Sequence, residues 1–263
     1  MAKALKLSDN EYFNSDYSKY LSKSRLWKFR QDPVSLFTEQ DDFDENKQHF
    51  VIGSALHTLA LEGEDVYVER YTVIECINPK TKRSYGRTSK VFLAACADKE
   101  LIPAFVLTPA DDAQIRKMHK AIKEHFSASG YIDMCEHVET VLRGTFEGVP
   151  AQGKLDGLSE PYNLIIDIKT CRSIDLFIRN YLVYGYDWQA ILYADLYNQC
   201  YGSDPDFYFI AVSNDDVPEV MTIEATNMFK PEREEDMRRT AKIYQQCIDQ
   251  QDYRLALFEL GDM

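Results

Sequence analysis

Three apolar runs with short turns between them lie in the middle of the chain, and they constrain its fold more than any other feature. The runs cover residues 138–146, 149–158 and 164–169, with turn-forming residues at 147–148 and 160–163. Apolar runs of this length, bounded by Gly, Pro, Asn or charged residues, predict β-strands. We therefore expect three consecutive strands that neighbour one another in a sheet.

Helical patterns stand on both sides of these runs. Residues 8–37 form a helical entry segment, in which a short helix begins at a Ser22 or Ser24 cap, continues through Arg30 and stops at Pro33. The other elements that we predict are helices over 50–61, 110–127, 184–200 and 231–251, strands over 207–212 and 217–225, and a mixture of short strands and a basic loop over 66–110. The order of these elements favours an α/β protein whose mixed central sheet is flanked by helices, with helical additions at the N-terminus.

The composition is that of a globular protein. Hydrophobic residues make up 45% of the 263 residues, but no run approaches the roughly 18 apolar residues of a membrane span, and the N-terminus has no signal-peptide core. We therefore expect a cytoplasmic protein without membrane contact. We find no repeat or linker, which predicts one domain over 1–263: an entry segment and acidic loop over 1–48, a core over 49–225, and a C-terminal helix and tail over 226–263.

The six cysteines are scattered, and none forms a Cys-x-x-Cys pair, which argues against a zinc or iron–sulfur site. The net charge of −13 is unusual for a protein that binds nucleic acid, because lysines and arginines normally supply most of that affinity. Basic residues nevertheless gather over 19–30 and 80–90, whereas acids gather over 41–45 and 232–236. An acidic exterior with a basic inner channel reconciles these numbers, and a uniformly solvated acidic surface is the alternative.

Two charges interrupt the apolar run at 164–169. Asp167 and Lys169 are two residues apart and share one face of the predicted strand, and a second acid, Asp156, lies eleven residues upstream on the preceding strand. Unpaired charges are costly to bury, so such residues pair with each other, bind a metal or take part in catalysis. The tripeptide alone is weak evidence, because residues 45–47 match it inside a polar loop. A plain ion pair therefore stands as the alternative to a catalytic site.

Four motifs together resemble the PD-(D/E)xK nuclease superfamily. They are Gly53-Ser54-Ala55-Leu56-His57, Gly153-Lys154-Leu155-Asp156-Gly157, Asp167-Ile168-Lys169 and Gln189-Ala190-Ile191-Leu192-Tyr193. The pattern is similar to the branch that contains the RecB nuclease domain and the RecE-type exonucleases, the exonuclease VIII group of phages and prophages. The segment 22–33 also resembles the opening of RecE-like proteins, so the likeness covers residues 20–200. Leu155 replaces the proline of the nominal motif, which leaves the acids in place.

The resemblance implies a role for the acids, the lysine and the histidine of these motifs. Asp156 and Asp167 would bind two Mg²⁺ ions, for which Mn²⁺ can substitute, and the Ile168 carbonyl would complete the shell. Lys169 would position or help deprotonate the attacking water. His57 would add a metal ligand, although a lone helix histidine is more often structural.

Three further groups of residues complete the expected site. Glu139 at the start of the first strand is the expected additional metal ligand, with Glu136 and Glu147 as competing candidates. Gln189 and Tyr193 share a helix face, which suits either the site or ordinary core packing. The candidate phosphate contacts are Arg25, Lys28, Lys82, Arg83 and Arg87. A cradle for a terminal 5′-phosphate at residues 22–25 is a further hypothesis.

The resemblance implies a Mg²⁺-dependent exodeoxyribonuclease that degrades linear double-stranded DNA 5′ to 3′. Its relatives act as rings, here expected as a trimer or tetramer, and pass the 3′ strand to a single-strand annealing protein for recombination. One alternative is an endonuclease or repair nuclease with the same core. A second alternative is a non-catalytic DNA-binding protein, which would be expected to lack an acid or the lysine. A third is an acidic DNA mimic. The mimic leaves the charged pair at 167–169 unexplained.

Overall fold

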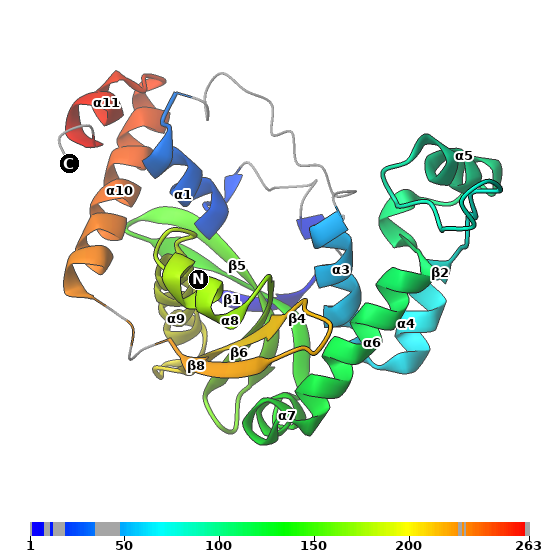
Figure 1. Cartoon of the computed structure of the whole chain (residues 1–263). Coiled ribbons are helices and arrows are strands. Elements are labelled where there is room, and N and C mark those ends of the chain that lie inside the picture. Colours follow the sequence, from blue (N-terminus) through cyan, green and yellow to red (C-terminus); the bar gives the residue numbers. More distant parts are fainter. Residues whose placement is uncertain are drawn as a thin grey trace.

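A computed structural model of the chain describes residues 2–7, 11–12, 19–34, 48–225, 228 and 230–260. These residues form a six-stranded sheet in the order β1-β4-β5-β6-β7-β8, in which only β6 and β7 are parallel neighbours (Figure 1). The strands are β1 (Lys3–Lys6), β4 (His137–Phe146), β5 (Val149–Ser159), β6 (Leu164–Cys171), β7 (Asp206–Ser213) and β8 (Val220–Glu224). The prediction of a mixed central sheet is therefore confirmed.

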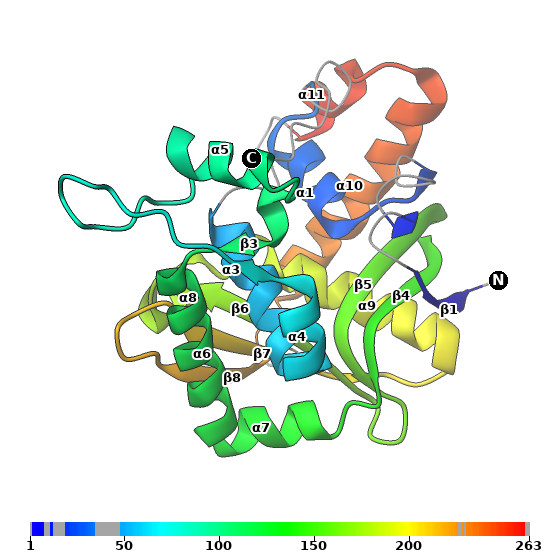
Figure 2. The ribbon, with the colours of Figure 1, turned by 90° about the vertical axis from the view of Figure 1, so that its right-hand side faces the viewer.

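Helices cover both faces of this sheet (Figures 1 and 2). They are α1 (Lys23–Gln31), α3 (Gln48–His57), the π-helix η3 (Thr58–Glu62), α4 (Glu64–Arg70), α5 (Lys90–Asp98), η4 (Pro103–Phe105), α6 (Pro109–Glu124), α7 (Phe126–Asp133), α8 (Ile174–Asn180), α9 (Tyr186–Tyr201), α10 (Pro231–Gln250) and α11 (Arg254–Leu260). One hydrophobic cluster joins α1, α8, α9 and α10 to the sheet, and a second joins α3, α6 and α7 to its other face. None of the described helices is long and apolar enough to cross a bilayer.

The three central strands lie where their apolar runs predict them. Positive φ angles at Glu147, Gly148 and Asn163 reverse the chain at the two predicted turns. The entry helix also matches, because the Ser22 side chain accepts a hydrogen bond from the Arg25 amide and caps α1. The acidic stretch at 41–45 and the tripeptide at 45–47 lie outside the described residues.

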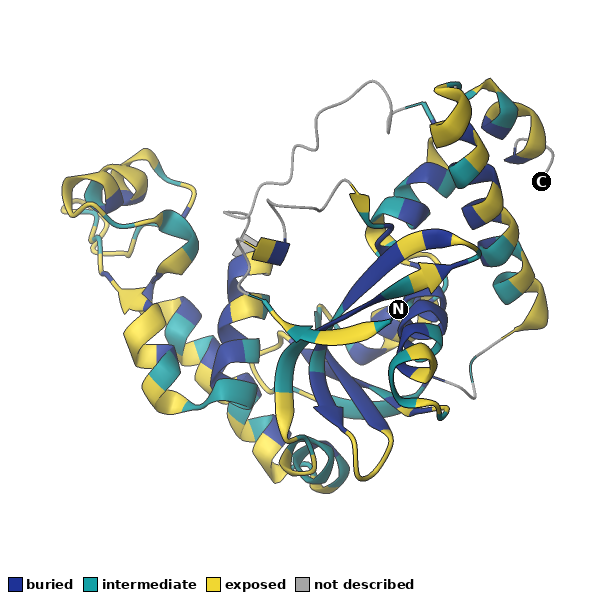
Figure 3. Cartoon of the chain, turned by 180° about the vertical axis from the view of Figure 1, so that it is seen from behind, coloured by how far each residue is buried: buried dark blue, intermediate teal, exposed yellow. Residues whose placement is uncertain are grey.

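The prediction of short strands and a basic loop over 66–110 was incomplete. The two-residue strands β2 (Thr72–Val73) and β3 (Val106–Leu107) pair there, but the structure also has helices α4 and α5, which the prediction missed. This region has its own small core around Phe92 and Cys96 and projects from the main body as a largely exposed arm (Figure 3). Its elements are too short to show a clear period in the sequence.

Several short elements escaped prediction. β1 is four residues long and mostly exposed, so it lacks the alternation that marks a half-buried strand. The helix predicted over 110–127 ends at Glu124, because His125 interrupts it and caps α7 by accepting a hydrogen bond from the Ala128 amide. α8 and α11 have seven residues each, which is too short for a helical period to be recognised in the sequence.

Helix α9 packs closely against the β4–β5 hairpin. At Gly153, a Cβ atom would lie 2.5 Å from the Tyr193 ring, so only glycine permits this approach. Gly185, which precedes α9, has a φ of +62° and packs on the Trp27 ring of α1. Gly153 therefore lets α9 approach β5, and Gly185 lets α1 approach the start of α9.

Candidate metal centre and active site

Side chains from three separate elements meet at the point where β5 and β6 separate. His57 ends α3, Glu139 lies on β4 and Asp156 lies on β5, and one ligand atom from each falls within 4.8 Å of the others. The described β5–β6 ladder ends at the pair Gly157–Ile166. Beyond that pair the strands diverge, which opens the space that the three side chains occupy.

Ile168 supplies the backbone groups at this fork. Its N–H donates to Asp156 Oδ2 over 2.7 Å, and its carbonyl oxygen lies 2.7 Å from His57 Nε2. Because a carbonyl oxygen only accepts, Nε2 is the nitrogen that donates to it, and the other ring nitrogen, Nδ1, lies 3.5 Å from Asp156 Oδ2. The predicted grouping of His57, Asp156 and the Ile168 carbonyl is therefore present in the structure.

Asp167 lies behind this cluster and is only 2% exposed. Gln189 Nε2 donates a short hydrogen bond to Asp167 Oδ2, and Lys169 Nζ forms an ion pair with Asp167 Oδ1. Rings of Tyr186 and Phe209 lie 5.5 and 5.9 Å from Lys169 Nζ. The structure thus brings Gln189 to the site, as one of its two sequence interpretations required.

Tyr193 is also buried beside the site, but its contacts are those of a core residue. Its ring stacks on Phe207 with centroids 6.2 Å apart and covers Gly153. Burial raises the pKa of Tyr193 well above its ordinary value, so the hydroxyl stays protonated. Tyr193 therefore supports the β5 backbone between Gly153 and Asp156 by packing, and its catalytic role stays a prediction.

The electrostatics of the cluster centre on Asp156. Burial, with repulsion from Asp167 and Glu139, raises the pKa of Asp156 to about 7 against the opposing influence of His57 and Lys169. For Lys169, burial favours the neutral amine, but the carboxylates of Asp167 and Asp156 outweigh it and raise the pKa. Without a bound cation, the site therefore holds a protonated lysine and an acid that is costly to ionise.

Lys23 also lies near this centre, although the sequence placed it only in the hypothetical 5′-phosphate cradle at 22–25. It is the first residue of α1, its Nζ donates to the Tyr184 carbonyl, and it lies 5.5 Å from the Tyr186 ring. Burial, followed by repulsion from Lys169, lowers the pKa of Lys23 to about 8. In the sequence, Lys23 is part of the basic stretch at 19–30, but only the fold shows that it lies near Lys169.

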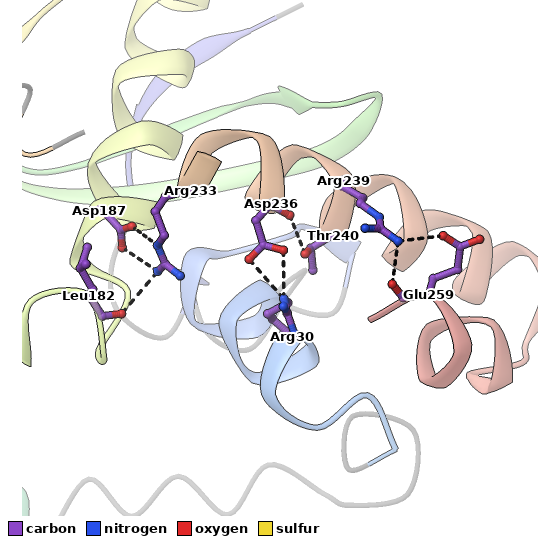
Figure 4. A network of polar contacts seen from close by, with 8 residues as sticks. All are labelled: Arg30, Leu182, Asp187, Arg233, Asp236, Arg239, Thr240 and Glu259. Carbon is purple, nitrogen blue, oxygen red and sulfur yellow. Dashed lines mark hydrogen bonds and ion pairs between the residues drawn. The ribbon is translucent and has the colours of Figure 1, made fainter. Parts of the chain in front are cut away.

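A buried ion pair holds the first turn of α9 against α10 (Figure 4). Arg233 Nε donates to Asp187 Oδ2 over 2.7 Å, and the guanidinium lies 5.2 and 5.7 Å from the rings of Trp27 and Trp188. Asp187 is fully buried and precedes Gln189 by two residues on the same helix. This contact therefore fixes the part of α9 from which Gln189 reaches Asp167.

The two competing acids have other partners. The Glu136 carboxylate accepts hydrogen bonds from the Ser159 hydroxyl and the Glu160 amide. Glu147 forms ion pairs with Arg238 and Lys242. Of the three candidates, the geometry therefore selects Glu139, whose carboxylate also forms an ion pair with Lys154.

The predicted phosphate contacts differ in their surroundings. The prediction for Arg87 was wrong: the residue is 5% exposed, and its guanidinium donates to the carbonyls of Val106 and Pro103 inside the arm. Lys82 and Arg83 are exposed in the loop. Arg25 Nε donates to the Tyr244 hydroxyl over 2.8 Å, and Lys28 is half-buried on the same helix. For these four residues, DNA contact stays a prediction.

The donor set fits a divalent cation. Two carboxylates and one imidazole nitrogen gather in the cluster, with the Ile168 carbonyl beside His57, and these are hard or borderline ligands of the kind that Mg²⁺ and Mn²⁺ take in proteins. The raised pKa of Asp156 is an observation in the same direction, because a cation would remove the cost of ionising that buried carboxyl. The cluster residues His57, Glu139 and Asp156 would hold the ion, and ligation by Asp167 and the Ile168 carbonyl stays a prediction.

The fold and this arrangement of acids and lysine define a protein of the PD-(D/E)xK nuclease superfamily. The chain belongs to the family described as the PDDEXK-like domain of unknown function (DUF3799), whose sequence profile matches residues 22–253. A crystal structure from Eubacterium rectale, described provisionally as that of an exonuclease, is similar with a TM-score of 0.58 and 14% identity. The match covers 98% of this chain and 88% of that one. No curated protein matches the sequence.

Proposed function

We propose that this protein is a divalent-metal-dependent deoxyribonuclease that degrades linear double-stranded DNA from its ends. The observation that carries the proposal is the convergence of His57, Glu139 and Asp156 with the Asp167–Lys169 pair at one fork of the sheet. The description of the Eubacterium rectale structure as an exonuclease supports the same activity. Every acid of the site and the lysine are present, so a non-catalytic protein that merely retains the fold is not favoured.

Divalent cations, when bound, would supply an activated water and neutralise charge on the phosphoryl oxygens. The residues of the chain have complementary tasks. Lys169 is held by Asp167 and two aromatic rings, so it presents a protonated amine that stabilises negative charge as it develops on the phosphate. Gln189 fixes the orientation of Asp167 and thereby of the lysine.

Lys23 adds a second amine near Lys169 and Asp167. Because its pKa is lowered to about 8, a large part of the population is still protonated at neutral pH. Lys23 and Lys169 thus offset part of the negative charge of the carboxylates at the site, within a chain of net charge −13. These two amines support the proposal of a basic path for DNA inside an acidic exterior.

The finer properties of the proposed enzyme rest on the resemblance to RecE-type exonucleases. They are Mg²⁺ as the metal, with two ions and Mn²⁺ as a substitute, 5′-to-3′ polarity, and 3′ tails as the product. A ring of three or four copies around DNA, cooperation with a single-strand annealing protein, and a role in recombination in the bacterial or phage-infected cytoplasm complete the proposal. DNA ends are then the direct partner.

Digestion of DNA tests the activity. Wild-type protein with Mg²⁺ or Mn²⁺ should degrade 5′-phosphorylated linear duplex, and Asp156→Ala and Lys169→Ala should each lower the rate at least about 100-fold. Covalently closed circular DNA should persist. Equal cutting of the circle would replace the exonuclease by an endonuclease, and full activity of either variant would contradict the site.

A further inference from the structure

The β4–β5 hairpin carries a second polar pair on the same face as the metal cluster. In its register, Arg143 pairs with Gln152 and Val141 with Lys154. Two residues further along each strand, Glu139 and Asp156 approach each other in the metal cluster. The opposite face packs on α9, where Gly153 meets Tyr193. Side chains alternate along a strand, so Gln152, Lys154 and Asp156 form one row that leads away from the fork. Gln152 is four residues, or about 13 Å, from Asp156.

Arg143 is unusual for a buried arginine. It is 9% exposed, its Nε donates to Gln152 Oε1 over 3.1 Å, and the Tyr20 ring lies 4.3 Å from its guanidinium carbon. Among the described residues, no carboxylate forms an ion pair with it. Within the described part of the chain, its Nη2 and the Nε2 of Gln152, a residue that is fully buried, have no hydrogen-bond partner.

A buried guanidinium without a counter-charge is unfavourable unless a ligand supplies the anion. The two unpaired groups, Arg143 Nη2 and Gln152 Nε2, are both donors, and together they suit the oxygens of a phosphate. Lys3 on β1 pairs with Arg143 in the sheet and adds a positive charge next to it. Tyr20 fixes the plane of the guanidinium.

We infer that Arg143 and Gln152 bind a backbone phosphate of the DNA strand that runs from the metal centre along β5. This inference rests on the proposed function for the identity of its ligand. The separation of about 13 Å places the bound phosphate a few nucleotides from the cleaved bond. The pair holds the strand in register with the metal cluster, and it acts as a positioning site outside the reacting atoms.

DNA substrates in which a single phosphate has been made neutral can show which phosphate binds at Arg143. A series of linear duplexes carries a single neutral methylphosphonate at successive positions from the cleaved end, and single-turnover cleavage is measured for wild type, Arg143→Met and Arg254→Met. Arg254 is an exposed arginine bonded only to Asp252 among the described side chains, so its variant is the matched control. Wild type and control should lose roughly 10- to 100-fold at one position within the first few nucleotides.

Arg143→Met should cleave unmodified DNA more slowly by the same factor and show no further loss at that position. A loss in the variant that equals the wild-type loss at every position would overturn the inference. Arg143→Lys, which keeps the charge and not the paired donors, should fall between the two.

Thermal unfolding without DNA separates a ligand site from a structural one. If Arg143 is an anion-binding residue, Arg143→Met should unfold at the same or a higher temperature than wild type. Inorganic phosphate should also stabilise wild type more than chloride does at equal ionic strength. The variant should not respond to phosphate. A lower unfolding temperature of the variant, or no effect of phosphate on wild type, would overturn the anion site. If phosphate acts as expected but wild type neither binds nor cleaves DNA, the proposed function fails instead.

Discussion

Replacement of Asp156 by asparagine should stabilise the metal-free protein at neutral and alkaline pH. The native pKa of Asp156 is about 7, compared with 3.8 for an unperturbed aspartate, because the carboxyl is buried. A native pKa above the unfolded one means that the native state binds its proton more tightly. The associated stability is fully present below pH 3.8 and is lost as the pH rises to about 7.

The size of the effect follows from the two pKa values. Each pKa unit corresponds to about 1.4 kcal/mol, so ionisation of Asp156 destabilises the native state by at most about 4 kcal/mol above pH 7 and by well under half of that at pH 5. Asparagine keeps an oxygen that accepts the hydrogen bond of the Ile168 amide and carries no charge. The stability advantage of Asp156→Asn should therefore grow by at most about 3 kcal/mol between pH 5 and pH 8.

Thermal unfolding in EDTA at several pH values measures this difference. For a chain of this size, 1 kcal/mol corresponds to about 2–4 °C, so the advantage should grow by several degrees. Asp206→Asn, at an exposed position on β7, is the control and should show no such trend. An advantage of Asp156→Asn that is constant or shrinks as the pH rises would refute the reasoning. Addition of Mn²⁺ should raise the unfolding temperature of wild type more than that of the variant.

Two packing predictions concern the supports of the site. Gly153→Ala should destabilise the protein by about 1–3 kcal/mol in chemical unfolding, because the new methyl group meets the Tyr193 ring. Tyr193→Leu in the same chain should recover part of that loss. Equal losses with and without the second change would contradict the contact. Arg233→Leu leaves Asp187 buried and unpaired, so it should cost about 3–5 kcal/mol and lower cleavage. Arg239→Leu, on an exposed face of the same helix, should cost under about 1 kcal/mol, and a similar cost for both would show that the buried pair has no special role.

The sequence was most informative where pattern and tertiary structure agree. The strands β4, β5 and β6 are long, apolar and separated by residues that tolerate turns, so local preference alone places them. The same strands carry Asp156, Asp167 and Lys169, which explains why the centre of the site could be predicted from residues and spacing. The convergence of His57 and Gln189 on that centre followed from the resemblance.

The remaining features depend on contacts that no local pattern encodes. Glu139 could be separated from Glu136 and Glu147 only after the fold showed which carboxylate faces Asp156. Arg87 looked like a phosphate contact because it lies in a basic loop, but α6 and β3 enclose it. Lys23 is near Lys169 because α1 packs beside the start of α9, more than 140 residues away in the chain.

Direct measurement of metal binding tests the central claim, that the cluster at the β5–β6 fork is a divalent-metal centre. Calorimetric titration of Mn²⁺ and Mg²⁺ into the metal-free protein should show saturable binding. Glu139→Gln and Asp156→Asn should each weaken this binding by at least about tenfold, because each removes a charged ligand. Glu136→Gln, three residues from Glu139 but bonded to Ser159, should bind as wild type does. Absence of binding to wild type at millimolar metal, or equal binding by all four proteins, would contradict the account.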